Sequence, residues 1–179
     1  MLQREHTALV VVDVQGKLAQ LMHDKAELFA NLRRMIQGAR ILEVPILVTE
    51  QYPQGIGPTV AEIADLLTDV ESISKTSFSC CGEDLFNASL QGLNRRQILL
   101  TGIETHICVH QTALHLIDAG YEVQVVADAV SSRTLDNKEI GLNKMQAAGV
   151  VITSTETALY ELLQAAEGPR FKAVLRLVK

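Results

Sequence analysis

The stretch LLTGIETHICVHQTALHLIDAGYEV (Leu99–Val123) contains most of a strand, a turn, a helix and the start of a second strand. An apolar run over Gln97–Thr101 predicts a buried strand. Apolar residues then recur at helical spacing over Thr105–Ala119, and Gly120 ends this predicted helix. A second apolar strand follows at Glu122–Ala127. The pattern predicts two parallel strands joined by a helix.

The same alternation of short apolar runs and amphipathic stretches continues in both directions from this unit. Continuous apolar runs, rather than every second residue, are what a parallel sheet buried on both faces requires. Thr59, with Glu62 three residues later, is a candidate N-cap of one helix. We therefore expect a three-layer α/β/α fold with a doubly wound, Rossmann-like sheet of six parallel strands. The other expected strands are Thr7–Asp13, Pro45–Glu50, Glu71–Lys75 and Val150–Thr153, and the other expected helices are Lys25–Glu43, Thr59–Leu67, Glu83–Gln91, Lys138–Ala148 and Thr157–Ala165.

Length and composition limit the classes of protein to which this chain can belong. The 179 residues predict one domain over 1–179, and 47% hydrophobic with 21% charged residues is ordinary globular composition. A formal net charge of −5 without a basic block argues against nucleic acid or an anionic membrane as partner. The apolar run near the N-terminus is too short for a signal peptide or a membrane span, so we expect a cytoplasmic protein. The basic, apolar segment 169–179 packs either on the domain or on a second subunit.

The chain has three cysteines, Cys80, Cys81 and Cys108. An odd number with two adjacent residues is not a disulfide framework, and no Cys/His array has the spacing of a zinc site. Reduced thiols are therefore expected, which leaves a catalytic thiol open. For Cys80 and Cys81 we favour packing over reactivity.

Chemically capable side chains follow several of the predicted strands. In open parallel sheets, ligands bind at the carboxyl ends of the strands near the point where the strand order reverses. Asp13 ends the first strand, Lys75 the third, and the segment after the fourth runs to Cys108. Glu50 and Asp128 stand at two further strand ends. Each residue alone has an ordinary structural explanation, but their placement at one edge favours a site.

The three types of group suit nucleophilic catalysis. The thiolate is the nucleophilic form of cysteine, and a helix N-terminus or a nearby ammonium lowers a thiol's pKa. Cys108 is expected near a helix start, with Lys75 as its electrostatic partner. Asp13 is placed to accept the thiol proton and later to donate it to a leaving amine. Backbone N–H groups before the helix are candidates for stabilising an oxyanion. His106 and His110 flank Cys108 but lie away from its helical face, so a Cys–His pair is not favoured.

The sequence resembles the isochorismatase-like cysteine hydrolases, which include nicotinamidases and carbamoylsarcosine amidases. The resemblance rests on VVVDVQ (Val10–Gln15), SKTSFS (Ser74–Ser79) and the long segment Leu99–Val123, and it continues through ADAVSSR (Ala127–Arg133). It therefore covers nearly the whole chain. The EQYPQGIGPT loop (Glu50–Thr59) is most similar to a small, little-characterised branch found in bacteria and animals.

The resemblance implies an Asp–Lys–Cys triad at Asp13, Lys75 and Cys108. It also implies a cis peptide between Ile103 and Glu104, which would direct the N–H of Glu104, together with that of Cys108, at an oxyanion. The implied reaction is cleavage of a C–N amide bond through a thioester. A dimer or tetramer of identical chains is the assembly that the resemblance implies.

The sequence departs from two kinds of family member. Nicotinamidases resemble one another in a metal-binding Asp-x-His motif after the second strand, whereas Glu50–Gly55 here contains no histidine. We therefore predict no metal and no cofactor, and nicotinamide is not the expected substrate. Isochorismatases of siderophore pathways lack the nucleophilic cysteine, so Cys108 argues against isochorismate.

Four further residues are candidates for lining the pocket of a small-molecule substrate: Gln15, Tyr52, Phe78 and Ile103. Loop packing is the alternative for Tyr52 and Phe78, and Glu104 points its carboxylate either at a neighbouring subunit or at solvent. The alternative function is a non-catalytic interaction protein that retains the fold. A dinucleotide enzyme is set aside because DVQGKLAQ, after the first strand, has only one glycine.

Overall fold

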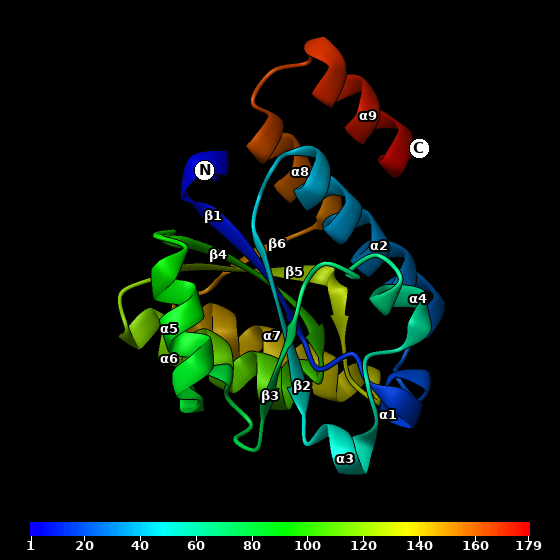
Figure 1. Cartoon of the computed structure of the whole chain (residues 1–179), viewed down its shortest axis with the longest axis vertical. Helices are drawn as coiled ribbons and strands as arrows, with labels where there is room; N and C mark the ends of the chain where they lie inside the picture. Colours follow the sequence, from blue (N-terminus) through cyan, green and yellow to red (C-terminus); the bar gives the residue numbers. More distant parts are fainter.

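The computed structural model describes residues 1–179 and contains one six-stranded parallel sheet. The strand order is β3-β2-β1-β4-β5-β6, so the chain builds outward from β1 in one direction and then from β4 in the other (Figure 1). The expected doubly wound α/β/α fold is confirmed. The strands are β1 (Thr7–Val12), β2 (Ile46–Gln51), β3 (Ser72–Lys75), β4 (Gln97–Ile103), β5 (Glu122–Ser131) and β6 (Val151–Thr153).

Helices cover both faces of the sheet (Figure 1). Three short 3-10 or π-helical segments supplement them: η1 (Arg4–His6), η2 (Cys80–Gly82) and η3 (Thr105–Val109). The helices are α1 (Gly16–Gln20), α2 (Lys25–Ile41), α3 (Pro53–Ile56), α4 (Ala61–Ala64), α5 (Asp84–Gly92), α6 (His110–Asp118), α7 (Leu135–Ala147), α8 (Thr155–Leu163) and α9 (Gly168–Val178).

The central strands are buried on both faces, which is why their sequences are continuous apolar runs. Side chains alternate along a strand, so Leu9 and Val11 of β1 join the core under α2, α8 and α9. Val10 and Val12 of the same strand join the core under α5, α6 and α7. One apolar run therefore supplies both cores.

Several expected boundaries were wrong for local reasons. Thr59 does not cap a helix; its N–H and hydroxyl instead donate to Glu50 Oε1, at 2.6 and 2.7 Å, and only Ala61–Ala64 is helical. Helix α7 begins three residues earlier than expected, because the Thr134 side chain caps it by accepting from the N–H of Asn137. The apolar pattern alone did not reveal this cap.

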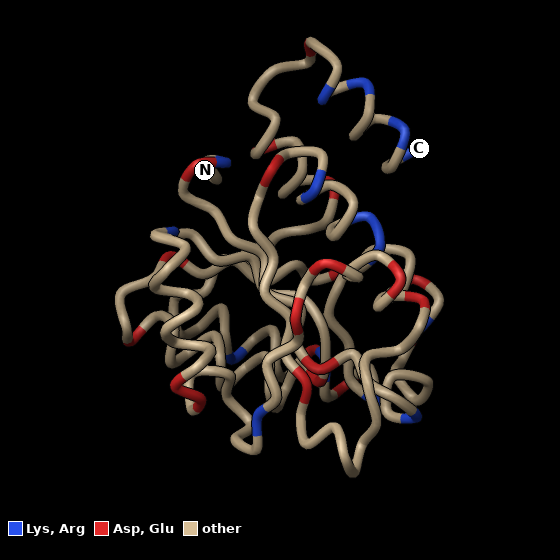
Figure 2. The backbone as a smooth tube through the Cα atoms, viewed as in Figure 1, with Lys and Arg blue, Asp and Glu red and all other residues tan.

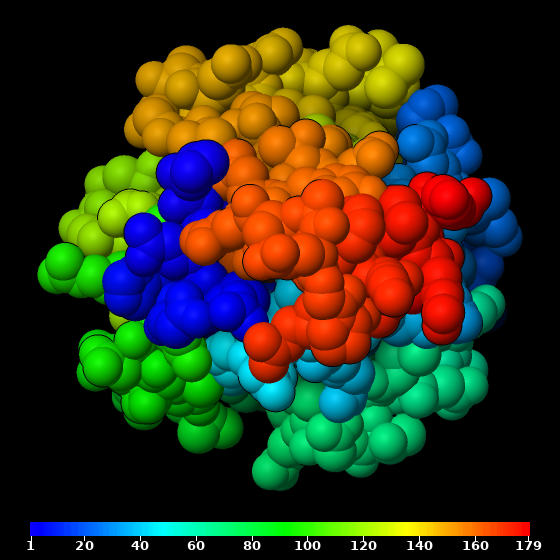
Figure 3. All heavy atoms as spheres, turned by 90° about the horizontal axis from the view of Figure 1, so that it is seen from above, coloured from blue at the N-terminus to red at the C-terminus, as the bar shows by residue number.

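The C-terminal segment forms α9, a helix that packs on α2 and α8 of the same chain. Val174 is fully buried there, while Lys172 and Arg176 are exposed. Figure 2 marks the basic positions along this helix in blue. From above, C-terminal residues cover the middle of the molecule beside the N-terminal segment (Figure 3). The two ends are also joined by a hydrogen bond from the Leu2 N–H to Glu161 of α8. Packing on the domain, the first of the two expected alternatives, is thus what the structure shows.

Candidate active site

The reversal of strand order places a crevice at the carboxyl ends of β1 and β4. These strands are neighbours, but the helices after them lie on opposite faces of the sheet. Gly102 allows the two strands to meet closely, because its φ is +107° and a Cβ there would lie 2.1 Å from the Val12 carbonyl oxygen. Asp13 follows β1 at this point and the segment carrying Cys108 follows β4.

Asp13 is a buried carboxylate held by two partners. It is 3% exposed and its backbone adopts φ +51°. Oδ1 accepts a hydrogen bond from Thr49 Oγ1 at 2.7 Å. Oδ2 lies 2.6 Å from Lys75 Nζ and has no other partner in the protein. Oδ1 is thus held by a structural hydrogen bond, and Oδ2 takes part only in the ion pair with Lys75.

Lys75, from the end of β3, is the buried cation of this pair and is 2% exposed. Its ammonium also donates to Gln51 Oε1 at 2.7 Å and to the carbonyls of Ser77 and Phe78 at 3.0 and 2.9 Å. Burying an ammonium is costly unless its donors are satisfied, and here all three N–H groups have acceptors. The lysine is therefore held in one position, as a fixed positive charge beside Asp13.

Cys108 lies in the π-helical turn η3, before the start of α6, and is 8% exposed. Burial raises the pKa of its thiol to about 12, and the Asp13 carboxylate adds to the rise while Lys75 opposes it. Lys75 does lower this pKa, as expected, but the net shift is upward rather than downward. Loss of water and the nearby carboxylate outweigh the ammonium, so the resting thiol is protonated.

The Ile103–Glu104 peptide is cis, as the family resemblance implied. The backbone N–H of Glu104 has no hydrogen-bond partner within the protein. Its carboxylate accepts from the N–H of Arg133 at 2.9 Å and from the Arg133 guanidinium at 3.2 Å. The Glu104 carboxylate is thus buried against Arg133 of the same chain, which corrects the alternative that it points to solvent. The turn is anchored while one backbone donor remains free.

A cavity of about 120 Å³ opens onto these groups. Three of the expected pocket residues, Gln15, Phe78 and Ile103, line it. Tyr52 does not, which corrects that prediction: it is 55% exposed and its ring lies against Gly55. The full lining is Asp13, Gln15, Leu18, Gln51, Ile56, Phe78, Ile103, Glu104, Ile107 and Cys108.

Four lining residues were not predicted from the sequence: Leu18, Gln51, Ile56 and Ile107. Leu18 and Ile56 belong to the short helices α1 and α3, which no apolar periodicity predicted. Glu50 and Asp128, at other strand ends, proved to be structural: Glu50 holds Thr59, and Asp128 accepts from the N–H and hydroxyl of Thr155 at the start of α8. Of the three acids Asp13, Glu50 and Asp128, only Asp13 lines the cavity.

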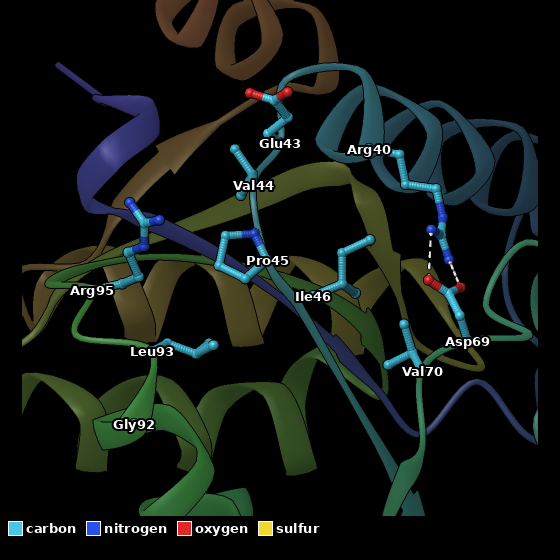
Figure 4. A pocket seen from close by; sticks show the side chains of 10 residues that line it. All are labelled: Arg40, Glu43, Val44, Pro45, Ile46, Asp69, Val70, Gly92, Leu93 and Arg95. Atoms are coloured by element: carbon cyan, nitrogen blue, oxygen red, sulfur yellow. Dashed lines mark hydrogen bonds and ion pairs between the residues drawn. The ribbon is translucent and has the colours of Figure 1, made fainter.

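A larger hollow, of about 530 Å³, lies at the opposite end of the sheet (Figure 4). It surrounds the start of β2 at Pro45 and Ile46 and contains an ion pair between Arg40 and Asp69. Ligands of open parallel sheets bind at the carboxyl ends of the strands, and this hollow is at the amino ends. It also contains neither the thiol nor the Asp13–Lys75 pair, so the smaller cavity is the candidate active site.

The other two thiols, those of Cys80 and Cys81, lie outside the cavity. Cys80 is fully buried, with Sγ 3.6 Å from Thr49 Oγ1, and burial raises its pKa to about 12. Burial also raises the pKa of the half-buried Cys81. All three cysteines are free. The burial of Cys80 agrees with packing, and the reactivity of both residues stays untested.

No group of three or more His, Cys, Asp or Glu side chains is placed to hold a metal ion. The absence of a metal stays a prediction from the sequence. None of the helices is both long and apolar enough to cross a membrane.

Replacing Asp13 with asparagine is expected to lower the pKa of Cys108. The carboxylate that opposes the thiolate is removed, while the Lys75 ammonium remains beside it. Thiolate absorbance against pH, taken as the difference from a Cys108→Ala protein, measures this. Wild type should show little Cys108 thiolate below about pH 10, and the Asp13→Asn protein should ionise at lower pH. An unchanged or higher midpoint in the variant would contradict the placement of Asp13 against the thiol.

The fold and this site define an α/β protein with a thiol and a buried Asp–Lys pair at the switch point of its sheet. Residues 7–157 match the family model described as the isochorismatase domain. The chain belongs to the isochorismatase domain family.

Relatives and solved structures agree with this membership. The chain is 39% identical over 173 residues to Isochorismatase domain-containing protein 2 of Xenopus laevis, covering 96% of this chain and 83% of that protein. It is 38% identical to the secreted isochorismatase effector Isc1 of Phytophthora sojae, with 97% and 84% covered. It spans 59% of the length of the zebrafish Isochorismatase domain-containing protein 1. The MAR1 ribonuclease of Caenorhabditis elegans superimposes with a TM-score of 0.92 at 36% identity, covering 99% and 91% of the two chains.

Proposed function

We propose that this protein is a cysteine hydrolase that cleaves a C–N amide bond of a small molecule. Cys108 is the nucleophile, Asp13 the general acid and base, and Lys75 the fixed charge that orients Asp13. The observation that carries the proposal is the buried 2.6 Å pair of Asp13 and Lys75 beside a thiol in the same cavity. Core packing gives no reason to bury two charges next to a cysteine.

The first half of the reaction follows from the protonated resting thiol. The Cys108 proton passes to Asp13 Oδ2 as Sγ forms a bond to the substrate carbonyl carbon. The carbonyl electron pair moves to oxygen, and this oxyanion is stabilised by the free N–H of Glu104, together with that of Cys108. Asp13 then donates the proton to the leaving nitrogen as the C–N bond breaks. The products are an amine and a Cys108 thioester.

The second half reverses these roles. A water loses a proton to Asp13 and attacks the thioester carbonyl, and the oxyanion forms at the same backbone donors. Collapse expels the Cys108 sulfur, which takes the proton back from Asp13. Lys75 keeps its charge throughout, so Asp13 alternates between two protonation states beside a constant ammonium.

Ribonuclease activity, which the name of the C. elegans neighbour gives to that protein, is not favoured for this site. A polynucleotide needs free cations for its phosphates and space for a base. The cavity holds about 120 Å³, and its ammonium, Lys75, is surrounded by protein acceptors. A non-catalytic interaction protein remains the second candidate, since the exposed Phe78 offers an apolar contact beside the site. It gives no account of the buried ion pair.

The experiment that tests the proposal is an ammonia-release screen over small amides, combined with intact-mass detection of an acyl group on Cys108. Wild type should release ammonia from at least one amide and carry the acyl adduct at short reaction times. The Cys81→Ala protein is the matched control, because it loses a thiol outside the cavity and should behave as wild type. Release without any adduct, or release that persists equally in Cys108→Ser, would overturn the thiol mechanism. Assembly into a homo-oligomer and a cytoplasmic location stay predictions.

A further inference from the structure

The geometry points to a substrate class: we propose that the cavity selects a small, electrically neutral amide with a short apolar acyl group. The inference rests on the proposed function and adds what that function leaves open. It follows from the apolar lining of the cavity, from the few polar groups that remain free there and from the volume of the cavity.

The walls are apolar. Leu18 and Ile56 come from the two short helices after β1 and β2, and Ile107 comes from the turn that carries Cys108. Ile103 is fully buried at the end of β4, and Phe78, 56% exposed, stands at the opening. Burying a substrate's apolar group against these side chains is favourable by the hydrophobic effect.

The polar side chains in the lining are already engaged with the protein. Gln15 donates to the carbonyls of Gln51 and Gly57 at 3.0 and 2.7 Å, and its oxygen accepts from the Gln51 N–H at 2.6 Å. The Gln51 amide accepts from Lys75 and donates to the Thr76 carbonyl, both at 2.7 Å.

The acids in the lining are engaged as well: Asp13 is held by Lys75, and Glu104 by Arg133. What remains for a ligand is the thiol, one face of Asp13 and the unpartnered N–H of Glu104.

The groups that remain free can bind a carbonyl, but none of them is a positive charge that would balance a substrate carboxylate. The ammonium of Lys75 is bound on all three donors, and the Arg133 guanidinium is held by Glu104. A substrate carboxylate would therefore be desolvated next to the negative charge of Asp13, which is strongly unfavourable. We expect charged amides to lose about 100-fold or more in kcat/KM against neutral ones of equal size.

The volume limits the size of the substrate. A cavity of about 120 Å³ is far smaller than the 300–1,000 Å³ typical of sites for drug-sized ligands. A cavity of this size has room for only a short chain beside the reacting carbonyl. A primary amide with a short aliphatic chain fits these limits.

Alkylation of Cys108 by iodoacetamide and by iodoacetate tests the selection directly. The two reagents have the same size and react alike, the sulfur displacing iodide while the thiol proton leaves to a base. They differ in being a neutral amide and a carboxylate. The ratio of their rates at Cys108, followed by intact mass and divided by the same ratio for glutathione, should be about 50 or more in favour of iodoacetamide. A normalised ratio near one, or failure of both reagents to reach Cys108, would overturn the proposal.

Two variants sharpen the test. Leu18→Lys places an ammonium in the lining and should lower the normalised ratio by about tenfold or more, because it supplies the missing counter-charge. Phe78→Lys, at the exposed opening, should act in the same direction even if the first variant folds poorly. Leu21→Lys is the matched control, since Leu21 is 63% exposed and outside the lining, and it should leave the ratio unchanged. Equal effects of all three would also count against the inference.

This measurement is independent of turnover. Hydrolysis that needs Cys108 but prefers charged amides would refute the substrate class and leave the proposed function standing. Strong selection for iodoacetamide without hydrolysis of any amide would refute the function and leave the character of the cavity standing.

Discussion

Cys108→Ser is expected to lower kcat/KM for the best amide by about 10³-fold or more, which corresponds to about 4 kcal/mol of lost transition-state stabilisation. A serine hydroxyl is a far weaker acid than a thiol, and the same burial and carboxylate that raise the pKa of Cys108 oppose its ionisation further. Asp13 alone would then have to activate a much poorer nucleophile. Steady-state ammonia release with the best substrate from the screen measures the change.

The matched control for this prediction is Cys81→Ser. It makes the same chemical change at a half-buried thiol outside the cavity, so kcat/KM should stay within about twofold of wild type. Thermal unfolding should show that both variants are folded. A Cys108→Ser protein with a tenth or more of the wild-type kcat/KM would mean that sulfur does not attack the substrate.

Lys75→Met is expected to lower the free energy of unfolding by about 3–5 kcal/mol. The substitution keeps an unbranched side chain that is one atom shorter and removes the charge, so the buried Asp13 carboxylate loses its counter-ion. Three acceptors, Gln51 Oε1 and the carbonyls of Ser77 and Phe78, lose their donor as well. Urea unfolding at neutral pH, with wild type measured beside it, tests the size of the effect.

The double variant Asp13→Asn/Lys75→Met separates charge from packing. Removing both charges eliminates the uncompensated carboxylate, so part of the stability lost in Lys75→Met should return. A double variant that is less stable than Lys75→Met would show that the pair does not depend on charge balance. A single variant within about 1 kcal/mol of wild type would show that Lys75 is solvated, contrary to its burial.

Much of the fold was predictable because its signals are local. The apolar runs of β1 and β4 and the helical spacing in α2 and α6 each reflect burial of one element, and they identified the architecture. The short helices α1 and α3 were missed, since four or five residues do not complete a periodic pattern. Irregular pairing between β4 and β5 lets β5 run on to Ser131, beyond its apolar stretch.

The candidate site was likewise predictable only in part. The predicted strand ends place Asp13, Lys75 and Cys108 at one edge of the sheet, and the structure puts Asp13 and Lys75 in contact and Asp13 and Cys108 in one cavity. The sequence did not distinguish Asp13 from Glu50, because both are acids near the ends of strands. Only the contacts show that the Glu50 carboxylate is engaged by Thr59 and Ser72. The position of Tyr52 outside the cavity was equally beyond a sequence pattern.

By itself, the sequence determined the order of the six strands and of the longer helices, and it placed Asp13, Lys75 and one thiol near the ends of strands. These depend on periodicity and on chain direction, which are properties of neighbouring residues. The tertiary structure decided the protonation of Cys108, the engagement of Glu104 by Arg133 and the size and apolar character of the cavity. These depend on distances between residues remote in the chain and on how much water remains around each charge. A pKa and a cavity volume are sums over such distances, so the order of residues alone does not determine them.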